Sequence, residues 1–430
     1  MRASNVRAKE EGEDQLHPRE RKTTRRRFLL GSGALAALAG VDGSLLRAPN
    51  AIGASSGSPL GPGGIPLARR NNPVTLPIYS DNEPIDSGKS PEKGPLEVFN
   101  WSAYINPQVV KDFGKRYGVA VNVTTFENEE EALTKLTSSS VKFDVWFATV
   151  EYLGKAVAGK LIQPLNHAYL PNLGANIWPS LASPFYDVGS RYSVPYTVYT
   201  TGITWRKDKL KTPPTALANP YDIFWRTRAS GKVAVIDDLR EALGMALLRR
   251  HVQNVNTEES KLVDRAGNDL SQLTKSVRVK VNQTDYQDIP SGATWIAQAY
   301  SGDMAVSASY MPKGVPVSVV GFWRPDKGGM IGSDMITILR HTKRPVLAHR
   351  FLNYLLDRKH AVENFGWLGY VPPQNTLNPN KLISAGYVPP NLRSTIVGEQ
   401  EFEHDHTLLP LTIPGETLWQ DAWSKFKAGA

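Results

Sequence analysis

The strongest constraint on the fold comes from residues 96–149, where short apolar strands alternate with amphipathic helices. A strand begins at Leu96, and others are expected over Val119–Phe126 and Val141–Thr149. A helix from Pro107 to Gly118 separates the first two strands, and a second helix follows the next one. This β-α-β-α-β order predicts a parallel sheet covered by helices. We therefore expect an α/β fold.

The loop between the first strand and its helix carries two aromatic side chains and a hydroxyl, from Trp101, Tyr104 and Ser102. Open α/β sheets bind ligands beyond the carboxyl ends of their strands. Asn106 and Pro107 are typical of a helix start directly after this loop. The loop therefore predicts one wall of a pocket for a flat or cationic ligand. The alternative, in which both aromatics are ordinary rim or core residues, stays open.

The first 53 residues are typical of an export signal. An arginine pair within Thr24–Leu30 precedes an apolar run of about 14 residues that ends near Val41, too short to span a membrane comfortably. This pattern indicates the twin-arginine pathway, with cleavage between about Ala48 and Ala54. Residues 54–94 are rich in Gly, Pro and Ser, and we expect them to be a disordered linker.

Charge and composition exclude several classes of function. The net charge is +9, but +4 of it lies in residues 1–53, so the remainder is too weakly basic to indicate nucleic-acid binding. The chain has no cysteine. Disulfides, thiolate metal sites and cysteine nucleophiles are therefore excluded.

The remaining chain predicts a second α/β lobe. An extended segment, Tyr192–Arg206, follows the complete first unit and is expected to cross between lobes. A buried strand over 232–238 opens the second lobe, in which a helix is expected over 291–302 and a strand over 304–310. We expect the first lobe to comprise residues 95–200 and 334–371, and the second to comprise residues 201–333 and 372–430.

Two carboxylates follow the strand at 232–238. Asp238 and Glu241 are three residues apart at a helix N-terminus, where the helix dipole favours the ionised form. Such a pair suits an ammonium or guanidinium ligand. The same spacing is also that of a capping box, and the sequence alone favours this structural alternative.

No pattern in the sequence specifies catalysis. The segment Glu403–His406 contains His-x-His, but a third metal ligand at recognisable spacing is missing, so an exposed polar loop is favoured. The sequence has no phosphate-binding loop or HExxH motif. We expect neither an enzyme nor a resident metal or cofactor.

Taken together, several segments resemble the periplasmic spermidine/putrescine-binding proteins of ABC importers. The most specific are NWSAY at 100–104, DDLRE at 237–241 and GSD at 332–334; KFDVWFAT, SVPYTVYTTGITWRKDKL and LGYVPPQN occur in the same order. The resemblance covers residues 95–430. It implies a two-lobed clam of the type II periplasmic binding protein kind, with several crossing strands and a ligand cleft between the lobes. It also implies a monomeric periplasmic receptor that passes a polyamine to a membrane permease and its ATPase.

The resemblance also implies a set of ligand-binding residues. Its aromatic and hydroxyl members are Trp101, Ser102, Tyr104, Thr149, Tyr310 and Tyr370, of which Tyr310 stands where these proteins usually have Trp. Its acidic members are Asp238, Glu241 and Asp334, which would hold the ammonium groups. Aromatic faces suit the carbon chain and contribute cation–π contacts of roughly 0.5–2 kcal/mol each.

Three positions depart from the family pattern. Gly332 stands where a pocket Trp is usual, Glu151 where Tyr is frequent, and Ala103 where an acid is common. The pocket is therefore expected to lose aromatic wall and to gain an anion at Glu151, which we include among the candidate ligand-binding residues. These changes leave the identity of the amine open.

Two other functions stay open at this stage. Similar clams bind ferric ion through tyrosines, and Tyr196 and Tyr199 lie in the crossing segment, although the acids favour an ammonium. A secreted enzyme acting on amines is the third alternative, and no nucleophile, cofactor loop or metal set supports it.

Overall fold

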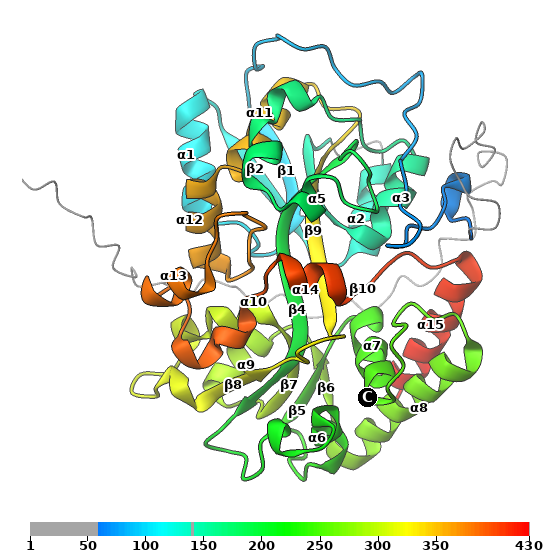
Figure 1. Ribbon diagram of the computed structural model, residues 1–430, viewed down its shortest axis with the longest axis vertical. Coiled ribbons are helices and arrows are strands. Elements are labelled where there is room, and N and C mark those ends of the chain that lie inside the picture. The colour runs from blue at the N-terminus through cyan, green and yellow to red at the C-terminus, as the bar shows by residue number, and fades with distance from the viewer. Residues whose placement is uncertain (1–58, 139–141, 430) are drawn as a thin grey trace, which may run out of the picture. The chain divides into compact units, whose positions relative to one another are not determined.

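A mixed ten-stranded sheet organises the residues that the structure describes (Figure 1). The computed structural model describes residues 59–138 and 142–429, all within a unit that spans residues 44–430. The predicted export signal lies outside the described residues. In this part of the chain, no helix has both the length and the hydropathy to cross a membrane.

The strands run in the order β2-β1-β3-β9-β4-β7-β5-β6, with β10 paired to β9 and β8 paired to β4. Their bounds are β1 Leu96–Trp101, β2 Val121–Phe126, β3 Val145–Thr149, β4 Ser193–Arg206, β5 Val233–Ile236, β6 Lys280–Asn282, β7 Ile296–Tyr300, β8 Val320–Trp323, β9 Met330–Ile338 and β10 His406–Thr407. The β2-β1-β3 and β7-β5-β6 groups are parallel. Strands β9 and β4 pair antiparallel with each other and with the edge of each group.

Strand β4 confirms the predicted crossing segment. Its first part pairs with β9 and its second part pairs with β7 and β8, so this one strand belongs to both halves of the sheet. β-branched and aromatic residues dominate it, as expected for a buried strand. Pro195, which cannot donate to a ladder, is opposite Met335 and directly precedes a register shift. Gly202 leaves room for the Phe322 ring and the Trp323 carbonyl of β8.

Helices cover the sheet on both sides (Figure 1). The α-helices are α1 Pro107–Tyr117, α2 Glu129–Thr137, α3 Val150–Ala158, α4 Pro171–Asn176, α5 Pro179–Ala182, α6 Ile223–Arg226, α7 Leu239–Arg249, α8 Ser260–Val277, α9 Asp285–Ser291, α10 Ser301–Ala305, α11 Pro345–Leu355, α12 Arg358–Leu368, α13 Pro379–Ser384, α14 Glu399–His404 and α15 Ile413–Lys427. Short 3₁₀ turns are η2 Pro62–Gly64, η3 His167–Tyr169, η4 Pro214–Ala216, η5 Pro220–Asp222, η6 Ser307–Tyr310, η7 Val317–Val319 and η8 Pro390–Thr395.

Asparagine side chains cap the first two helices, and the cap at Asn106 was predicted. Asn106 Oδ1 accepts a 2.9 Å hydrogen bond from the backbone N–H of Gln108, and α1 ends at Gly118 with φ +66°. Asn128 Oδ1 accepts from the N–H of Glu131 at 2.8 Å and starts α2. Caps of this kind can be predicted from the local sequence, because each one satisfies backbone N–H groups that a helix start leaves unpaired.

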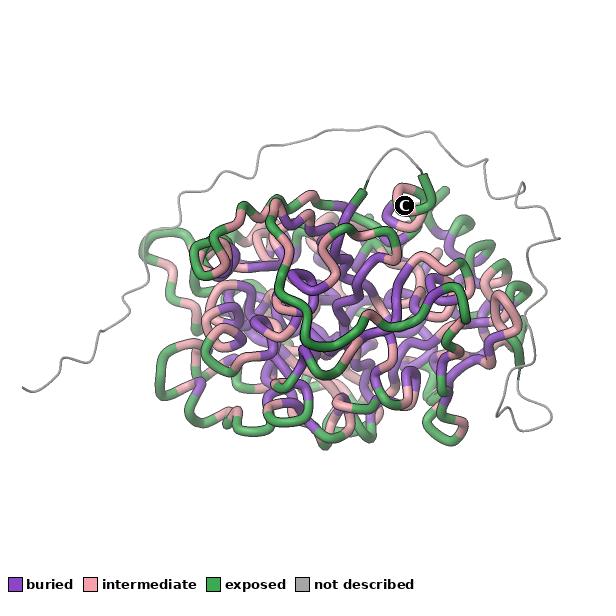
Figure 2. Tube along the Cα trace, turned by 90° about the horizontal axis from the view of Figure 1, so that it is seen from above, coloured by how far each residue is buried: buried purple, intermediate pink, exposed green. Residues whose placement is uncertain are grey.

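Buried side chains form two separate hydrophobic clusters inside the unit, and Figure 2 shows buried segments in its interior. The larger cluster includes Phe99, Phe113 and Trp146, which pack around the β2-β1-β3 half. The smaller cluster gathers around α7, α8 and α15 and contains Trp419. Two clusters on one sheet agree with the expectation of two lobes, and the exact lobe boundaries stay a prediction.

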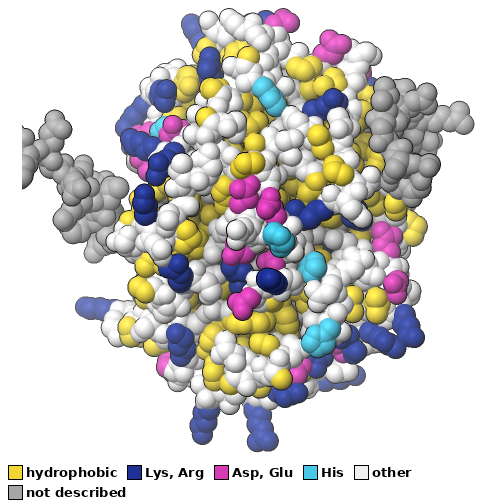
Figure 3. All heavy atoms as spheres, viewed as in Figure 1, with side chains coloured by type: hydrophobic (Ala, Val, Ile, Leu, Met, Phe, Trp, Pro, Cys, Tyr) yellow, Lys and Arg dark blue, Asp and Glu magenta, His cyan; other side chains and the backbone are white. Residues whose placement is uncertain are grey.

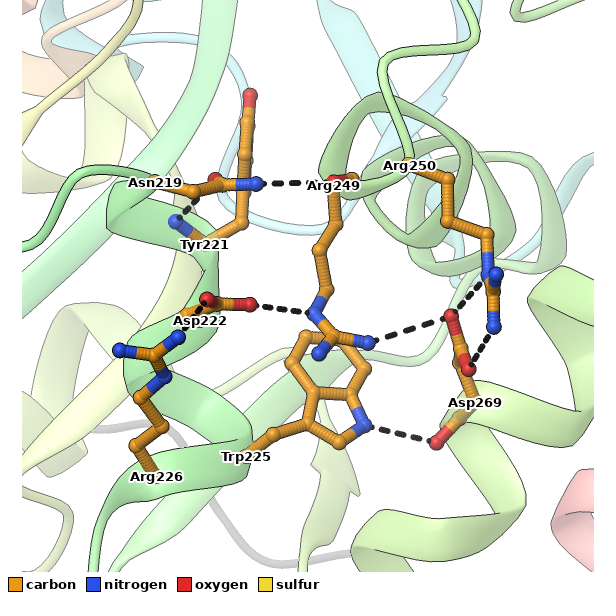
Figure 4. A network of polar contacts seen from close by, with 8 residues as sticks. All are labelled: Asn219, Tyr221, Asp222, Trp225, Arg226, Arg249, Arg250 and Asp269. Carbon is orange, nitrogen blue, oxygen red and sulfur yellow. Dashed lines mark hydrogen bonds and ion pairs between the residues drawn. The ribbon is translucent and has the colours of Figure 1, made fainter.

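A network of charged groups ties α6, α7 and α8 together beside the smaller cluster (Figure 4). Arg249 Nε lies 2.9 Å from Asp222 Oδ1, and its guanidinium stacks 4.1 Å above the Trp225 ring. Arg250 Nε lies 2.5 Å from Asp269 Oδ2. Asp269 is buried, and this network supplies the partners that its charge needs.

Residues 59–94 differ from the disordered linker that their composition predicted. Leu67, Val74 and Leu76 are buried in this segment. Val74 N donates to Phe185 O at 2.8 Å, and Tyr192 Oη donates to Pro77 O at 2.6 Å. The segment satisfies its backbone partly in short local turns, such as the reciprocal hydrogen bonds between Arg69 and Asn72, and partly on the rest of the domain. It therefore lacks the periodicity from which structure is usually predicted.

The expectations for residues 291–310 were also wrong. Gly292 has φ +78° and ends α9, so no helix begins at Ser291. Strand β7 and then α10 follow, where a helix over 291–302 and a strand over 304–310 were expected. Strand β7 is short and contains two alanines and a glutamine. It therefore lacks the continuous apolar pattern by which a buried strand is predicted.

Candidate functional site

The carboxyl ends of four strands converge on the middle of β4 and β9. Trp101 ends β1, Thr149 ends β3, Tyr300 ends β7, and Asp238 follows β5. In the sheet register, Asp334 of β9 is opposite Thr149 on one side and opposite Thr197 on the other. This is where open α/β sheets place ligands, and it is the candidate site.

Asp334 lies at the centre and receives hydrogen bonds from two phenols. Tyr104 Oη donates to its Oδ2 at 2.6 Å, and Tyr199 Oη donates to its Oδ1 at 3.4 Å. The residue is 5% exposed. Burial raises the pKa of Asp334 to about 7, and the hydrogen bonds from the two phenols oppose this rise. A cation that entered would favour the ionised form of this carboxyl.

The spacing of Asp238 and Glu241 left two roles open, helix capping and cation binding, and the structure shows a different environment for each residue. Asp238 Oδ1 accepts from the N–H groups of Arg240 at 2.8 Å and Glu241 at 3.0 Å, so the capping interpretation is confirmed for Asp238. Glu241 is buried and bonds to Thr201, and among the described residues its Oε2 has no partner. Burial and the Asp238 charge raise the pKa of Glu241 well above its usual range. An unpartnered buried carboxyl oxygen is costly and calls for a donor.

Glu151 lies near a cation that sequence reasoning missed. Burial raises the pKa of Glu151, and the positive charge of Arg240 opposes that rise. Arg240 is fixed by its other contacts, because its guanidinium donates to Asn256 Oδ1 at 2.6 Å and stacks 4.5 Å from the Trp419 ring. Arg240 therefore offsets part of the acidic charge without being free to move into the site.

Glu129 is a further acid that sequence reasoning missed. Its Oε1 accepts a 3.0 Å hydrogen bond from the N–H of Thr149, and its Oε2 has no partner in the described structure. Burial raises the pKa of Glu129 well above its usual range, and the charges of Asp334 and Glu151 add to this rise. The site thus holds five carboxyls and one arginine.

Tyrosine rings surround this acidic cluster. Tyr104 and Tyr199 each make edge contacts with Tyr370, at centroid distances of 5.0 and 5.5 Å. Tyr300 makes an edge contact with Tyr199 at 5.2 Å. Burial raises the pKa of all four phenols, and neighbouring carboxylates raise it further, so the four phenols stay neutral. Tyr199 was named only for the ferric-ion alternative, and Tyr300 was not among the expected residues, although it could have been found had β7 been recognised.

Three expected residues lie at the margin of this cluster or elsewhere. The Trp101 ring packs against Phe126 at 4.5 Å, and Ser102 is exposed, with its N–H donated to the Phe126 carbonyl. Tyr310 lies on η6 and packs edge-on against Tyr286 of α9. Tyr300 is the residue that joins the other tyrosines.

The metal alternatives find no support in these contacts. Acidic, basic and histidine side chains gather in the middle of the face in Figure 3, over α14 and β10 of Figure 1. There His406 Nε2 is 2.9 Å from Gln253 Oε1, and Asp405 accepts from Gly328 N. Within the described residues, no group of three or more His, Cys, Asp or Glu could hold a metal ion. The Tyr196 hydroxyl donates to Tyr104 O and accepts from Asn364.

A model of the bacterial extracellular solute-binding proteins matches residues 108–386. The chain belongs to this family. The predicted resemblance and the two-lobed α/β fold are therefore confirmed. The solute-binding protein is 26% identical over 288 residues to the putrescine/cadaverine-binding protein of Pseudomonas aeruginosa, covering 66% of this chain and 80% of that one. It is also 26% identical over 329 residues to the spermidine/putrescine-binding periplasmic protein of Escherichia coli, covering 76% of this chain and 86% of that one.

Solved structures show the same fold. The solute-binding protein superposes on a putative spermidine/putrescine ABC transporter from Listeria monocytogenes with a TM-score of 0.66 and 22% identity, over 77% of this chain and 98% of the other. A lipoprotein of Treponema pallidum gives a TM-score of 0.64 at 20% identity, over 77% of this chain and 98% of the other.

Proposed function

We propose that this solute-binding protein captures a polyamine in the periplasm and delivers it to the permease and ATPase of an ABC importer, without catalysis. The observation that carries the proposal is the cluster of buried carboxyls enclosed by tyrosines. Asp334 and Glu241 offer anionic oxygens, and the phenol rings offer faces for methylene groups. A flexible chain of ammonium and methylene groups complements both features.

The relatives and the N-terminal sequence support the proposed setting. Both relatives described above are named for polyamine binding, and one of them is named as periplasmic. The arginine pair within Thr24–Leu30 supports export by the twin-arginine pathway. We propose a monomer because a receptor of this kind needs only its own cleft to hold the solute.

Isothermal titration of the exported protein tests this function. Spermidine and putrescine are compared with 1,4-butanediol, an uncharged chain of similar length to putrescine. We expect one-to-one binding of at least one polyamine and none of the diol. Asp334→Ala and Glu241→Ala should each weaken binding more than roughly tenfold, because each leaves an ammonium without its carboxylate.

A surface variant provides the control. Asp112→Ala removes an acid on α1 whose side chain is 42% exposed, and this variant should bind as the wild type does. A folded protein that releases no heat with either polyamine would contradict the proposed function.

A further inference from the structure

Tyr199 and Gly332 form a matched large and small pair across two strands. They are directly opposite each other in the β4–β9 register, so their side-chain positions lie on the same face of the sheet. A Cβ added at Gly332 would lie 2.6 Å from Tyr199 Oη and closer still to the ring. The backbone of Gly332 is not in the left-handed region that favours glycine. The Tyr199 ring is therefore what excludes a side chain at position 332.

The same ring is held in place from its other sides. Tyr300 and Tyr370 contact it edge-on at 5.2 and 5.5 Å, with interplanar angles of 81° and 76°. Its hydroxyl reaches Asp334, two residues along β9 from Gly332. The aromatic wall that was expected to be lost at Gly332 is thus supplied by Tyr199 of β4.

The position of the hydroxyl limits what can reach Asp334. Tyr104 already engages Oδ2, and Tyr199 engages Oδ1, so an incoming ammonium must share the carboxylate with two phenols. A terminal primary ammonium carries three N–H groups and can donate to the carboxylate and to phenol oxygens together. An N-methylated ammonium offers fewer N–H groups and directs a methyl group at the packed rings.

We propose that Tyr199, seated on Gly332, is a specificity-determining residue that selects an unsubstituted terminal ammonium at Asp334. This inference rests on the proposed function, because it concerns which amine the same site accepts. It assigns the selection to β4, in a position that the expected set of ligand-binding residues did not include.

The selectivity test compares putrescine with N,N′-dimethylputrescine, which has the same charge and carbon spacing. The wild type should bind putrescine roughly tenfold or more tightly, because the methylated amine loses one or more polar contacts and the loss of one such contact lowers affinity by about that factor. Tyr199→Phe keeps the ring and removes the hydroxyl, so the preference should fall by several-fold. Tyr199→Gly removes the wall and should abolish the preference. Unchanged preference in both variants would overturn the proposal.

The pairing itself is tested without ligand. Gly332→Tyr should lower the melting temperature, because its ring meets Tyr199. The exchanged double variant, Tyr199→Gly with Gly332→Tyr, should recover most of the loss that Gly332→Tyr alone causes. Additive melting-temperature changes would contradict the pairing. A wild type that binds neither amine would contradict the proposed function, whereas these ligand-free melts would still test the seating of Tyr199 on Gly332.

Discussion

Tyr104 Oη donates a 2.6 Å hydrogen bond to Asp334 Oδ2, which joins the loop after β1 to the middle of β9. The same hydroxyl lies 2.6 Å from Thr197 Oγ1 of β4. Three segments that are far apart in the sequence thus meet at one carboxyl. The protonation of Asp334 therefore affects both the stability of the ligand-free protein and its affinity for a cation.

The first prediction concerns stability and pH. Burial raises the pKa of Asp334 from 3.8 to about 7, so the folded protein holds a proton that the unfolded chain releases. Stability of the ligand-free protein should therefore fall as pH rises from about 4 to 7, and then level off. The contribution of this group is on the order of 4 kcal/mol. Chemical denaturation at pH 5 and pH 8 measures about 3 kcal/mol of it, the part lost between pH 5 and pH 7.

Asp334→Asn is the control for this effect. His349 is also buried, and burial lowers its pKa to about 4, which acts on stability in the opposite direction. Both proteins contain His349, so the difference between them isolates Asp334. If the wild type and Asp334→Asn show the same change between pH 5 and pH 8, Asp334 does not titrate as we infer.

The second prediction concerns affinity and pH. A bound ammonium requires ionised Asp334, so polyamine binding should release a proton and strengthen as pH rises toward 7. Below that value, affinity should fall by up to about tenfold per pH unit, since RT ln 10 is the free energy of one unit. Titration in two buffers with different ionisation enthalpies counts the protons released. Equal affinity at pH 5 and pH 8 would argue that the amine binds away from Asp334.

The sequence predicted those site residues that follow a local pattern or the family resemblance. Asp238 and the caps at Asn106 and Asn128 follow local rules, because a helix start constrains the residues beside it. Asp334 and Tyr370 came from the family resemblance. Their contacts with Tyr104 show that the three residues come together, and their roles stay a prediction.

The missed residues depend on relationships that no local pattern contains. Tyr199 faces Gly332 only because β4 and β9 pair in one register. Glu129 begins a helix, and only the tertiary fold brings its carboxyl to the N–H of Thr149. Tyr300 was missed because β7 was expected to be helical. Tyr310 was named from the family resemblance, but it is Tyr300 that contacts Tyr199 and Tyr370.

The third prediction separates the two roles of Asp238. Asp238→Asn keeps an oxygen that can cap α7 but removes the charge, so stability should change little while polyamine affinity falls. Asp238→Ala also removes the cap and should cost about 1 kcal/mol more of unfolding free energy. Denaturation and titration of both variants measure the two effects. If Asp238→Asn binds polyamine as tightly as the wild type, Asp238 serves only as a cap.

The fourth prediction concerns residues 59–94. Leu76 is 2% exposed and packs in the larger hydrophobic cluster, whereas Leu60 in the same segment is 57% exposed. Leu76→Ala should lower the unfolding free energy by about 3 kcal/mol, because it leaves a cavity in a packed core. Leu60→Ala removes the same atoms from a solvent-exposed position and should leave stability within about 0.5 kcal/mol of wild type.

Denaturant unfolding of the two leucine variants distinguishes an attached segment from a free one. If the segment only tethered the folded domain, neither side chain would be removed from water, and neither substitution would change the unfolding free energy. The hydrogen bonds from Val74 N to Phe185 O and from Tyr192 Oη to Pro77 O flank Leu76 and fix it against the domain. The large loss of unfolding free energy should therefore occur only in Leu76→Ala. Equal stabilities of the two variants would instead support the disordered linker that the composition of residues 59–94 predicted.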